Sequence, residues 1–236
     1  MAGQPGDEIG HVHQDVSGGW LRPAVFGAMD GLVTNIALIA GVGGSGAGAH
    51  VIVLTGIAGL VAGAFSMALG EYASVETQND SVRAEATVER KELERNPAAE
   101  MAELVNSFVR MGLTRPTAQQ VAQEVHADPS LAIRVHLSQE LGVNPDDQPS
   151  PWLAAGSSFL CFAIGALVPL IPYLAGWPLL YAGLAAGAAG LFLAGALAAR
   201  FTTRPWWLGG LRQVMFGAIA ATATYLVGAL IGAGVA

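Results

Sequence analysis

The chain has 236 residues, of which 53% are hydrophobic and only 12% charged, and it contains 31 glycines. This composition is too apolar for a typical soluble domain and favours a membrane protein. The net charge is −7, but twelve of the 18 acidic residues lie between Glu71 and Glu140, so the acidity belongs to one segment. The only cysteine, Cys161, excludes an intrachain disulfide framework and a cysteine-based zinc site.

The N-terminal tail, residues 1–22, begins with an acidic rather than a basic stretch. Asp7, Glu8 and Asp15 occur where a secretory signal would carry Lys or Arg. We therefore expect the first apolar run to remain in the mature protein as a membrane span.

Five stretches reach the roughly 20 apolar residues that cross a hydrocarbon core. The connections after the first and third stretches are short and contain glycine, which predicts two antiparallel hairpins. We expect an all-α membrane protein with spans one and two in residues 23–70 and spans three to five in residues 151–236. The five stretches are Ala24 to Gly44, Val51 to Gly70, Trp152 to Leu174, Pro178 to Ala199 and Val214 to Val235.

The basic residues predict the orientation of these spans, because short cytoplasmic loops retain Lys and Arg. All eleven fall on one side of a five-span topology, which predicts a cytoplasmic N-terminus and an external C-terminus. One lysine against ten arginines in an Ala- and Gly-rich chain suggests a prokaryotic plasma membrane. In a eukaryote the same topology would fit a vacuolar membrane. The basic residues are Arg22, Arg83, Arg90, Lys91, Arg95, Arg110, Arg115, Arg134, Arg200, Arg204 and Arg212.

Residues 71–150 form an amphipathic insert between spans two and three, which we expect to be a three-helix cytoplasmic domain. Nothing breaks the second span before Asn96, so its helix is expected to continue into the insert. Three further helices are predicted from capping, proline and glycine signals. Their boundaries are Asn96-Pro97 with Gly112, a start near Pro116, and Asp128-Pro129 with Gly142, followed by a polar linker over 144–151.

Carboxylates recur at helical spacing within the insert. Like charges at this spacing repel by a few tenths of a kcal/mol per pair, a penalty that a bound cation would reverse. From spacing alone, a solvated helix face with an Arg90–Glu94 ion pair is the commoner explanation. The candidate metal ligands are the face Glu85, Glu89 and Glu92, the pair Glu100 and Glu103, and the pair His136 and Glu140.

Asp30 is the only ionisable side chain well inside a predicted span, where a charge costs roughly 2.5 to 3.5 kcal/mol. Met67 has a similar predicted depth in the second span, so that a carboxylate and a thioether are expected to face each other. A thioether suits a borderline metal ion better than Mg²⁺ or Ca²⁺. The alternative is a protonated or snorkelling Asp30 near the membrane edge.

Glycines four residues apart recur in the spans, a spacing that lets helix backbones approach closely. Packing within one subunit and a homodimer interface both explain them, and the sequence leaves the choice open. The pairs are Gly27 with Gly31, Gly59 with Gly63, Gly183 with Gly187, and Gly228 with Gly232.

From about Trp20 to the C-terminus, the chain resembles the vacuolar iron transporter family. Three segments carry the resemblance in the family's order: FGAMDGLVTNIALIAGV in the first span, FSMALGEYASVETQND at the end of the second, and GALVPLIPY in the third. The resemblance implies a homodimer that exports Fe²⁺, and also Mn²⁺ and other divalent ions such as Zn²⁺ and Co²⁺, from the cytoplasm in exchange for protons. These ions would be transported substrates, with no permanent cofactor.

The resemblance also assigns roles to residues of this chain. It places Asp30 and Met67 on a transport path along spans one and two at the dimer interface. It places Glu89, Glu92, Glu100, Glu103 and Glu140 among the carboxylates of a cytoplasmic metal-binding domain.

Two positions depart from the family pattern. Gly59 stands where some members have a glutamate, and His136 with Leu137 stands where some relatives have two methionines. His136 still offers a metal-binding nitrogen, so the resemblance implies a metal site with altered selectivity.

Other function classes find less support. A membrane-anchored metal buffer or sensor without transport is the alternative function. No HExxH or GxSxG motif indicates an enzyme. The acidic insert does not suggest nucleic-acid binding.

Overall fold

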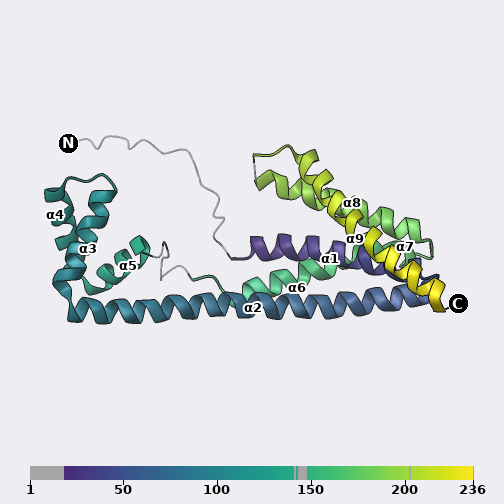
Figure 1. The fold of residues 1–236 in the computed structure, drawn as a ribbon, viewed down its shortest axis with the longest axis horizontal. Helices are drawn as coiled ribbons and strands as arrows, with labels where there is room; N and C mark the ends of the chain where they lie inside the picture. The colour runs from purple at the N-terminus through teal and green to yellow at the C-terminus, as the bar shows by residue number, and fades with distance from the viewer. Residues whose placement is uncertain (1–18, 141, 143–147, 202, 236) are drawn as a thin grey trace, which may run out of the picture.

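The computed structural model describes residues 19–140, 142, 148–201 and 203–235. Within these residues the regular structure is entirely helical (Figure 1). Residues 1–18 of the predicted tail and the first half of the predicted linker, 144–147, lie outside the described residues.

Five helical segments are long and apolar enough to cross a membrane. This finding confirms the predicted all-α membrane class, and the chain is an integral membrane protein. The segments are α1 (Leu21–Gly44), α2 (Ala49–Arg95), α6 (Pro151–Leu167) with its continuation to Leu174, α8 (Leu180–Ala198) and α9 (Trp206–Val235).

The longest helix, α2, runs along the whole length of the molecule (Figure 1). Its 47 residues correspond to about 70 Å, more than twice the thickness of a hydrocarbon core. The first part of α2 packs against the apolar bundle, and the last part carries the three shorter helices of the insert. One uninterrupted helix therefore connects the bundle with the insert, as the sequence predicts.

Two spans differ from the sequence-based expectation. The third is interrupted: α6 ends at Leu167, a 3₁₀ turn, η1, covers Val168–Leu170, and α7 covers Ile171–Leu174. Pro169 and Pro172 explain the interruption, because a proline removes a helical hydrogen-bond donor. The fifth helix begins at Trp206, well before the predicted Val214, because Arg212 lowers the hydropathy there without breaking the helix.

The first helix lies at the centre of the bundle, where it contacts α2, α6, α8 and α9. Glycines allow this arrangement: a Cβ atom on Gly31 would overlap the backbone of α6, and one on Gly228 would overlap the backbone of α1. All four glycine pairs face other helices of the same chain, so packing within one subunit explains them. The partners are Ser158 and Phe162 for Gly27 and Gly31, Leu38 and Phe162 for Gly59 and Gly63, Tyr173 and Ile36 for Gly183 and Gly187, and Gly41 and Ser45 for Gly228 and Gly232.

The insert contains α3 (Pro97–Arg110), α4 (Arg115–His126) and α5 (Pro129–Glu140), all close to the predicted bounds. Gly112 has a positive φ of 104°, which ends α3 as expected for a glycine stop. Asp128 caps α5, since its Oδ1 accepts hydrogen bonds from the backbone N–H groups of Ser130 (2.8 Å) and Leu131 (3.3 Å). A small apolar core joins the three helices and consists of Leu104, Val105, Phe108, Ala118, Ala122, Val125 and Ala132.

Candidate metal site

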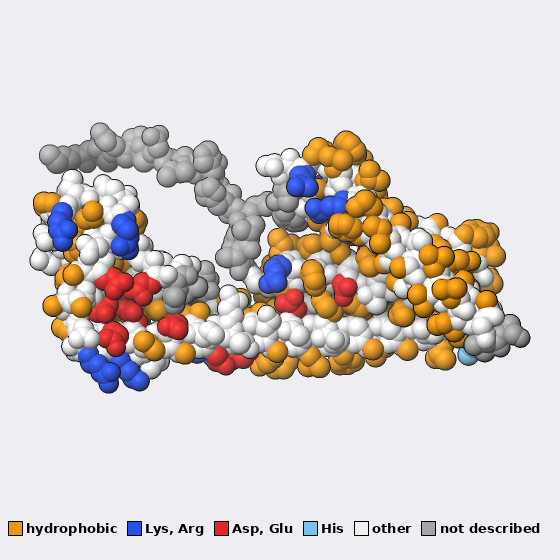
Figure 2. Space-filling view, viewed as in Figure 1, with side chains coloured by type: hydrophobic (Ala, Val, Ile, Leu, Met, Phe, Trp, Pro, Cys, Tyr) orange, Lys and Arg blue, Asp and Glu red, His pale blue; other side chains and the backbone are white. Residues whose placement is uncertain are grey.

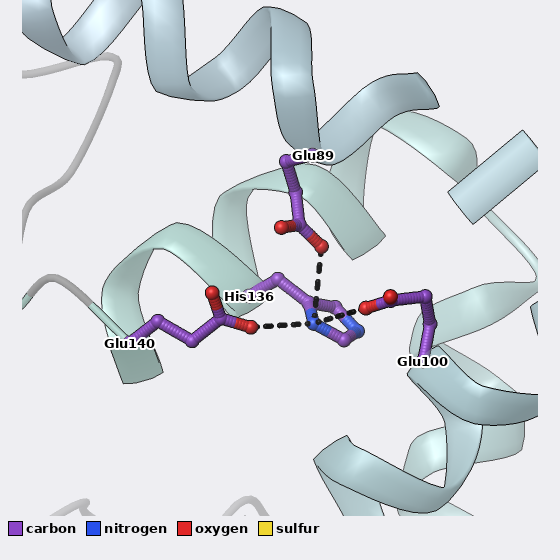
Figure 3. A group of neighbouring side chains, drawn as sticks. All are labelled: Glu89, Glu100, His136 and Glu140. Atoms are coloured by element: carbon purple, nitrogen blue, oxygen red, sulfur yellow. Dashed lines mark hydrogen bonds and ion pairs between the residues drawn. The ribbon is translucent and has the colours of Figure 1, made fainter. Parts of the chain in front are cut away.

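Four side chains from three helices converge beside the end of α2. Glu89 comes from α2, Glu100 from the first turn of α3, and His136 and Glu140 from successive turns of α5 (Figure 3). One potential ligand atom from each residue lies within 4.8 Å of the corresponding atoms of the other three. We refer to these four residues as the metal cluster.

The imidazole of His136 lies at the centre of the metal cluster. Its Nδ1 atom is 3.2 Å from Glu89 Oε1, 3.3 Å from Glu140 Oε1 and 3.6 Å from Glu100 Oε2 (Figure 3). The His136 side chain is only 1% exposed and those of Glu89 and Glu100 are about one-tenth exposed, whereas Glu140 is 37% exposed. Glu140 therefore forms the solvent-facing side of the metal cluster.

The carboxylates are held in an environment that disfavours their negative charge. Burial, together with the charges of Glu140, Glu100 and Glu103, raises the pKa of Glu89 to about 7 against the opposing effect of His136. Burial also raises the pKa of Glu100, and the neighbouring carboxylates of Glu103, Glu140 and Glu92 raise it as well against the opposing effect of His136. Glu89 Oε1 is buried and has no hydrogen bond within the described residues. A cation would compensate all of these effects.

The donor set and its spacing fit a divalent metal ion. Two ligand atoms at ~2.1 Å from a tetrahedrally coordinated ion are about 3.4 Å apart, close to the separations of 3.2–3.6 Å around His136 Nδ1. Carboxylate oxygens accept hard and borderline cations, and an imidazole nitrogen suits iron, cobalt and zinc. The metal cluster can therefore hold one borderline divalent ion with little rearrangement.

Two of the predicted ligands, Glu92 and Glu103, lie outside this group of four. Glu92 Oε2 accepts a hydrogen bond from Asn96 Nδ2 at 2.9 Å, and Glu103 is exposed on α3. Their charges still act on the metal cluster, because both raise the pKa of Glu100. Glu85, which shares the predicted helix face with Glu89, is exposed.

His126 also contacts a member of the metal cluster, although the sequence analysis did not select this residue. Its Nε2 atom is 3.1 Å from His136 Nε2, and the two rings meet edge to face. Burial lowers the pKa of His126, and the neighbouring His136 lowers it further. The available signal was its position at the last residue of α4, one short turn before α5.

The two predicted path residues lie in the bundle and have different neighbours. Thr34 Oγ1 donates to Asp30 Oδ1 at 3.5 Å, one turn along the same helix. Met67 packs against a cluster that includes Phe162 and Ala166 of α6. Both side chains are half-buried. Met67 precedes Glu89 by 22 residues, which places it about 33 Å away along α2.

The comparison with known proteins shows which family the chain belongs to. The family model described as "VIT family" matches residues 21–229. This chain belongs to the VIT family.

Several relatives of this VIT-family chain are vacuolar iron transporters by name. A protein named Vacuolar iron transporter from Acanthamoeba castellanii is 35% identical over 228 residues, which cover 94% of this chain and 83% of that protein. Vacuolar iron transporter 2 from Oryza sativa subsp. japonica is 27% identical over 208 residues, covering 87% and 85%. Vacuolar iron transporter 1 from Eucalyptus grandis is 32% identical over 157 residues, covering 65% and 62%. The family resemblance of the sequence is thus confirmed.

Proposed function

We propose that this VIT-family protein exports Fe²⁺ from the cytoplasm in exchange for protons and also carries Mn²⁺, Zn²⁺ or Co²⁺. Membership of the family and the names of its relatives support metal-ion transport. The observation that carries the proposal is the metal cluster: three carboxylates and a buried imidazole converge at the end of a helix that also crosses the bundle.

In this proposal the insert collects ions before translocation. The metal cluster binds the ion, and the flanking carboxylates of Glu92 and Glu103 attract cations to it electrostatically. Glu140 is the most exposed member of the metal cluster, so the ion enters and leaves on its side. His136 supplies the nitrogen ligand that favours iron over Mg²⁺ or Ca²⁺.

The ion then passes along Asp30 and Met67 in the bundle. Export of a dication against a negative-inside potential costs roughly 4.6 kcal/mol per 100 mV, twice the value for one charge. Entry of two protons per ion would cancel the charge movement. A carboxylate binds either a proton or a metal ion, so Asp30 is the proposed site at which the two compete.

The distribution of charge supports a cytoplasmic insert. On the face shown in Figure 2, the Lys and Arg side chains gather at the insert and at the nearer end of the bundle. Basic residues are retained on the cytoplasmic side of membrane proteins. The proposed location is a prokaryotic plasma membrane, or a vacuolar membrane if the source is eukaryotic.

The proposed assembly is a homodimer in which the path lies between two copies. Within one chain, α2 exposes a row of large apolar side chains at helical spacing: Val51, Leu54, Val61, Phe65 and Leu69 are each 47–67% exposed. Met67 lies on the same stretch of helix and is itself half-buried. In this proposal a second copy packs against α1 and α2 and supplies the opposite wall of the path that Asp30 and Met67 line. Crosslinking of cysteines introduced along this row would test the proposal.

Transport by the purified protein is the decisive experiment. We expect vesicles that contain the protein to accumulate Fe²⁺, and to accumulate Mn²⁺, Zn²⁺ or Co²⁺ to a different extent. Metal uptake should be faster when protons flow in the direction opposite to the metal ions. Metal binding without transport would instead support the metal buffer or sensor, which the family membership disfavours. Transport that ignores the proton gradient would refute the proton exchange.

A further inference from the structure

The contact between His126 and His136 is the feature of the insert that the four cluster residues leave unexplained. His126 ends α4, whereas His136 lies in the second turn of α5. The two Nε2 atoms are 3.1 Å apart, and the ring centroids are 5.3 Å apart at an interplanar angle of 64°. This geometry is that of a hydrogen bond between two imidazoles, in which one nitrogen donates and the other accepts.

The two ring nitrogens of His136 have different neighbours and therefore different roles. Nδ1 is surrounded by three carboxylates at 3.2–3.6 Å, so a metal ion in the cluster would bind this atom. The proton of the neutral ring must then lie on Nε2, the atom that contacts His126. Nε2–H of His136 donates to Nε2 of His126 in this arrangement, and the hydrogen bond fixes the tautomer that can bind metal.

The burial of His136 gives this hydrogen bond its importance. With the side chain 1% exposed, its Nε2–H has no access to bulk water as an alternative acceptor. His126, in contrast, lines a cavity of about 350 Å³ together with Arg90, Glu94 and Ser130. This cavity gives the His126 side chain access to water, which can satisfy its remaining nitrogen.

We propose that His126 is a positioning residue that holds the His136 ring with Nδ1 toward the carboxylates and thereby makes the metal cluster selective for ions that prefer nitrogen. The inference rests on the proposed metal binding by the cluster. Ions that accept imidazole well, Fe²⁺, Co²⁺ and Zn²⁺, depend on the orientation of this ring. Mn²⁺, which is satisfied by carboxylates and water, depends on it less.

The test compares Co²⁺, Zn²⁺ and Mn²⁺ binding by the purified full-length protein and its variants. His126→Phe keeps an aromatic ring but removes the acceptor. We expect Co²⁺ and Zn²⁺ to bind roughly 10- to 100-fold more weakly, as is typical when the partner of a metal-bound histidine is removed. The visible absorption of bound Co²⁺ should change as well, while the dissociation constant for Mn²⁺ changes much less.

Two further variants separate positioning from a loss of structure. His126→Gln supplies an amide oxygen as acceptor and should recover part of the Co²⁺ and Zn²⁺ affinity; it also serves if His126→Phe does not fold. His50→Phe is the matched control, because His50 is exposed near the start of α2, about 58 Å along the helix from Glu89.

The outcomes distinguish this inference from the proposed function. Unchanged Co²⁺ affinity and absorption in His126→Phe, or an equal loss for Mn²⁺ and Zn²⁺, would overturn the positioning role while leaving the metal cluster intact. If the unmodified protein bound none of the three ions, the proposed loading site would be wrong and the role of His126 would fall with it.

Discussion

The metal cluster of the insert and the candidate path in the membrane differ in how complete they are within one chain. At the cluster, three helices bring three carboxylates and an imidazole to a common point. In the bundle, Asp30 is hydrogen-bonded to Thr34 of its own helix, while Met67 packs against α6. In the proposed function, ion capture is therefore encoded in one folded chain, whereas ion passage requires a further surface or a rearrangement of the spans.

This contrast predicts that binding and transport can be separated by mutation. Changes at the metal cluster should act mainly on affinity, and changes in the bundle should act on the rate of passage. The following experiments test that separation.

The largest effect is expected for Asp30→Ala. Removal of the only carboxylate well inside the first span should reduce proton-driven Fe²⁺ transport to the level of empty vesicles, while metal binding by the insert is unchanged. Uptake into vesicles and calorimetric metal binding would be measured in parallel. Asp80→Ala, an exposed carboxylate paired with Arg83, is the control. Normal transport by Asp30→Ala would exclude this residue from the path.

Loss of the metal cluster should act in the opposite way. Combined replacement of Glu89, Glu100 and Glu140 by Gln should weaken Zn²⁺ and Fe²⁺ binding by roughly 100-fold or more, given that removal of a supporting partner alone costs 10- to 100-fold. Transport should fall at low Fe²⁺ and recover at saturating Fe²⁺, because the path is intact. The control is a variant in which Glu85 and Glu124, both exposed, are replaced by Gln. Undiminished metal binding would remove the loading role of the insert.

Metal affinity should depend on pH because Glu89 has a pKa of about 7. Below that value a metal ion must displace a proton, so affinity should fall about tenfold per pH unit if one proton is displaced. Above pH 7 the dependence should flatten. Titrations with Zn²⁺ between pH 5.5 and 8 would measure it, and a profile that is the same in Glu89→Gln would contradict the assignment.

The raised pKa of Glu89 also makes the stability of the metal-free protein depend on pH. The folded protein holds more protons than the unfolded chain between the ordinary glutamate pKa of 4.5 and about 7. Stability should therefore decrease as pH rises through this window. Thermal unfolding of the metal-free protein should show this decrease, and Glu89→Gln should reduce it.

The smallest effect is expected for Gly59→Glu, which adds a second carboxylate to the bundle. A Cβ atom at this position would overlap the end of the Leu38 side chain, which would have to move, and would lie 3.7 Å from Asn35 Oδ1. We expect a stability cost of about 1 to 3 kcal/mol from the added volume and a changed dependence of transport on the proton gradient. Gly59→Gln has nearly the same volume without the charge, so an identical transport profile in both variants would show that ionisation is irrelevant.

The helix boundaries of the insert were predictable because local chemistry sets them. Proline at position 97, glycine at position 112 and the Asp128 cap act within one turn of the helix ends that they define. The start of α9 at Trp206 was missed, since average hydropathy falls around Arg212 while the helical hydrogen bonds continue through it.

The composition of the metal cluster was predictable only in part. Helical spacing places Glu85, Glu89 and Glu92 on one face, but the packing of α3 and α5 decides that Glu89 alone is buried in the cluster. His126 carried no recognisable spacing, because its relation to His136 depends on the angle between α4 and α5. Such angles are set by the apolar core of the insert and cannot be predicted from the spacing of residues in the sequence.

The unbroken course of α2 also fixes a rotational phase between the two regions. Met67 and Glu89 are separated by 22 residues, about 6.1 helical turns, which leaves them within about 40° of each other around the axis. Each residue added or removed between them would turn one relative to the other by about 100°. The length of the connecting stretch thus determines which side of the helix an ion leaving the cluster would follow.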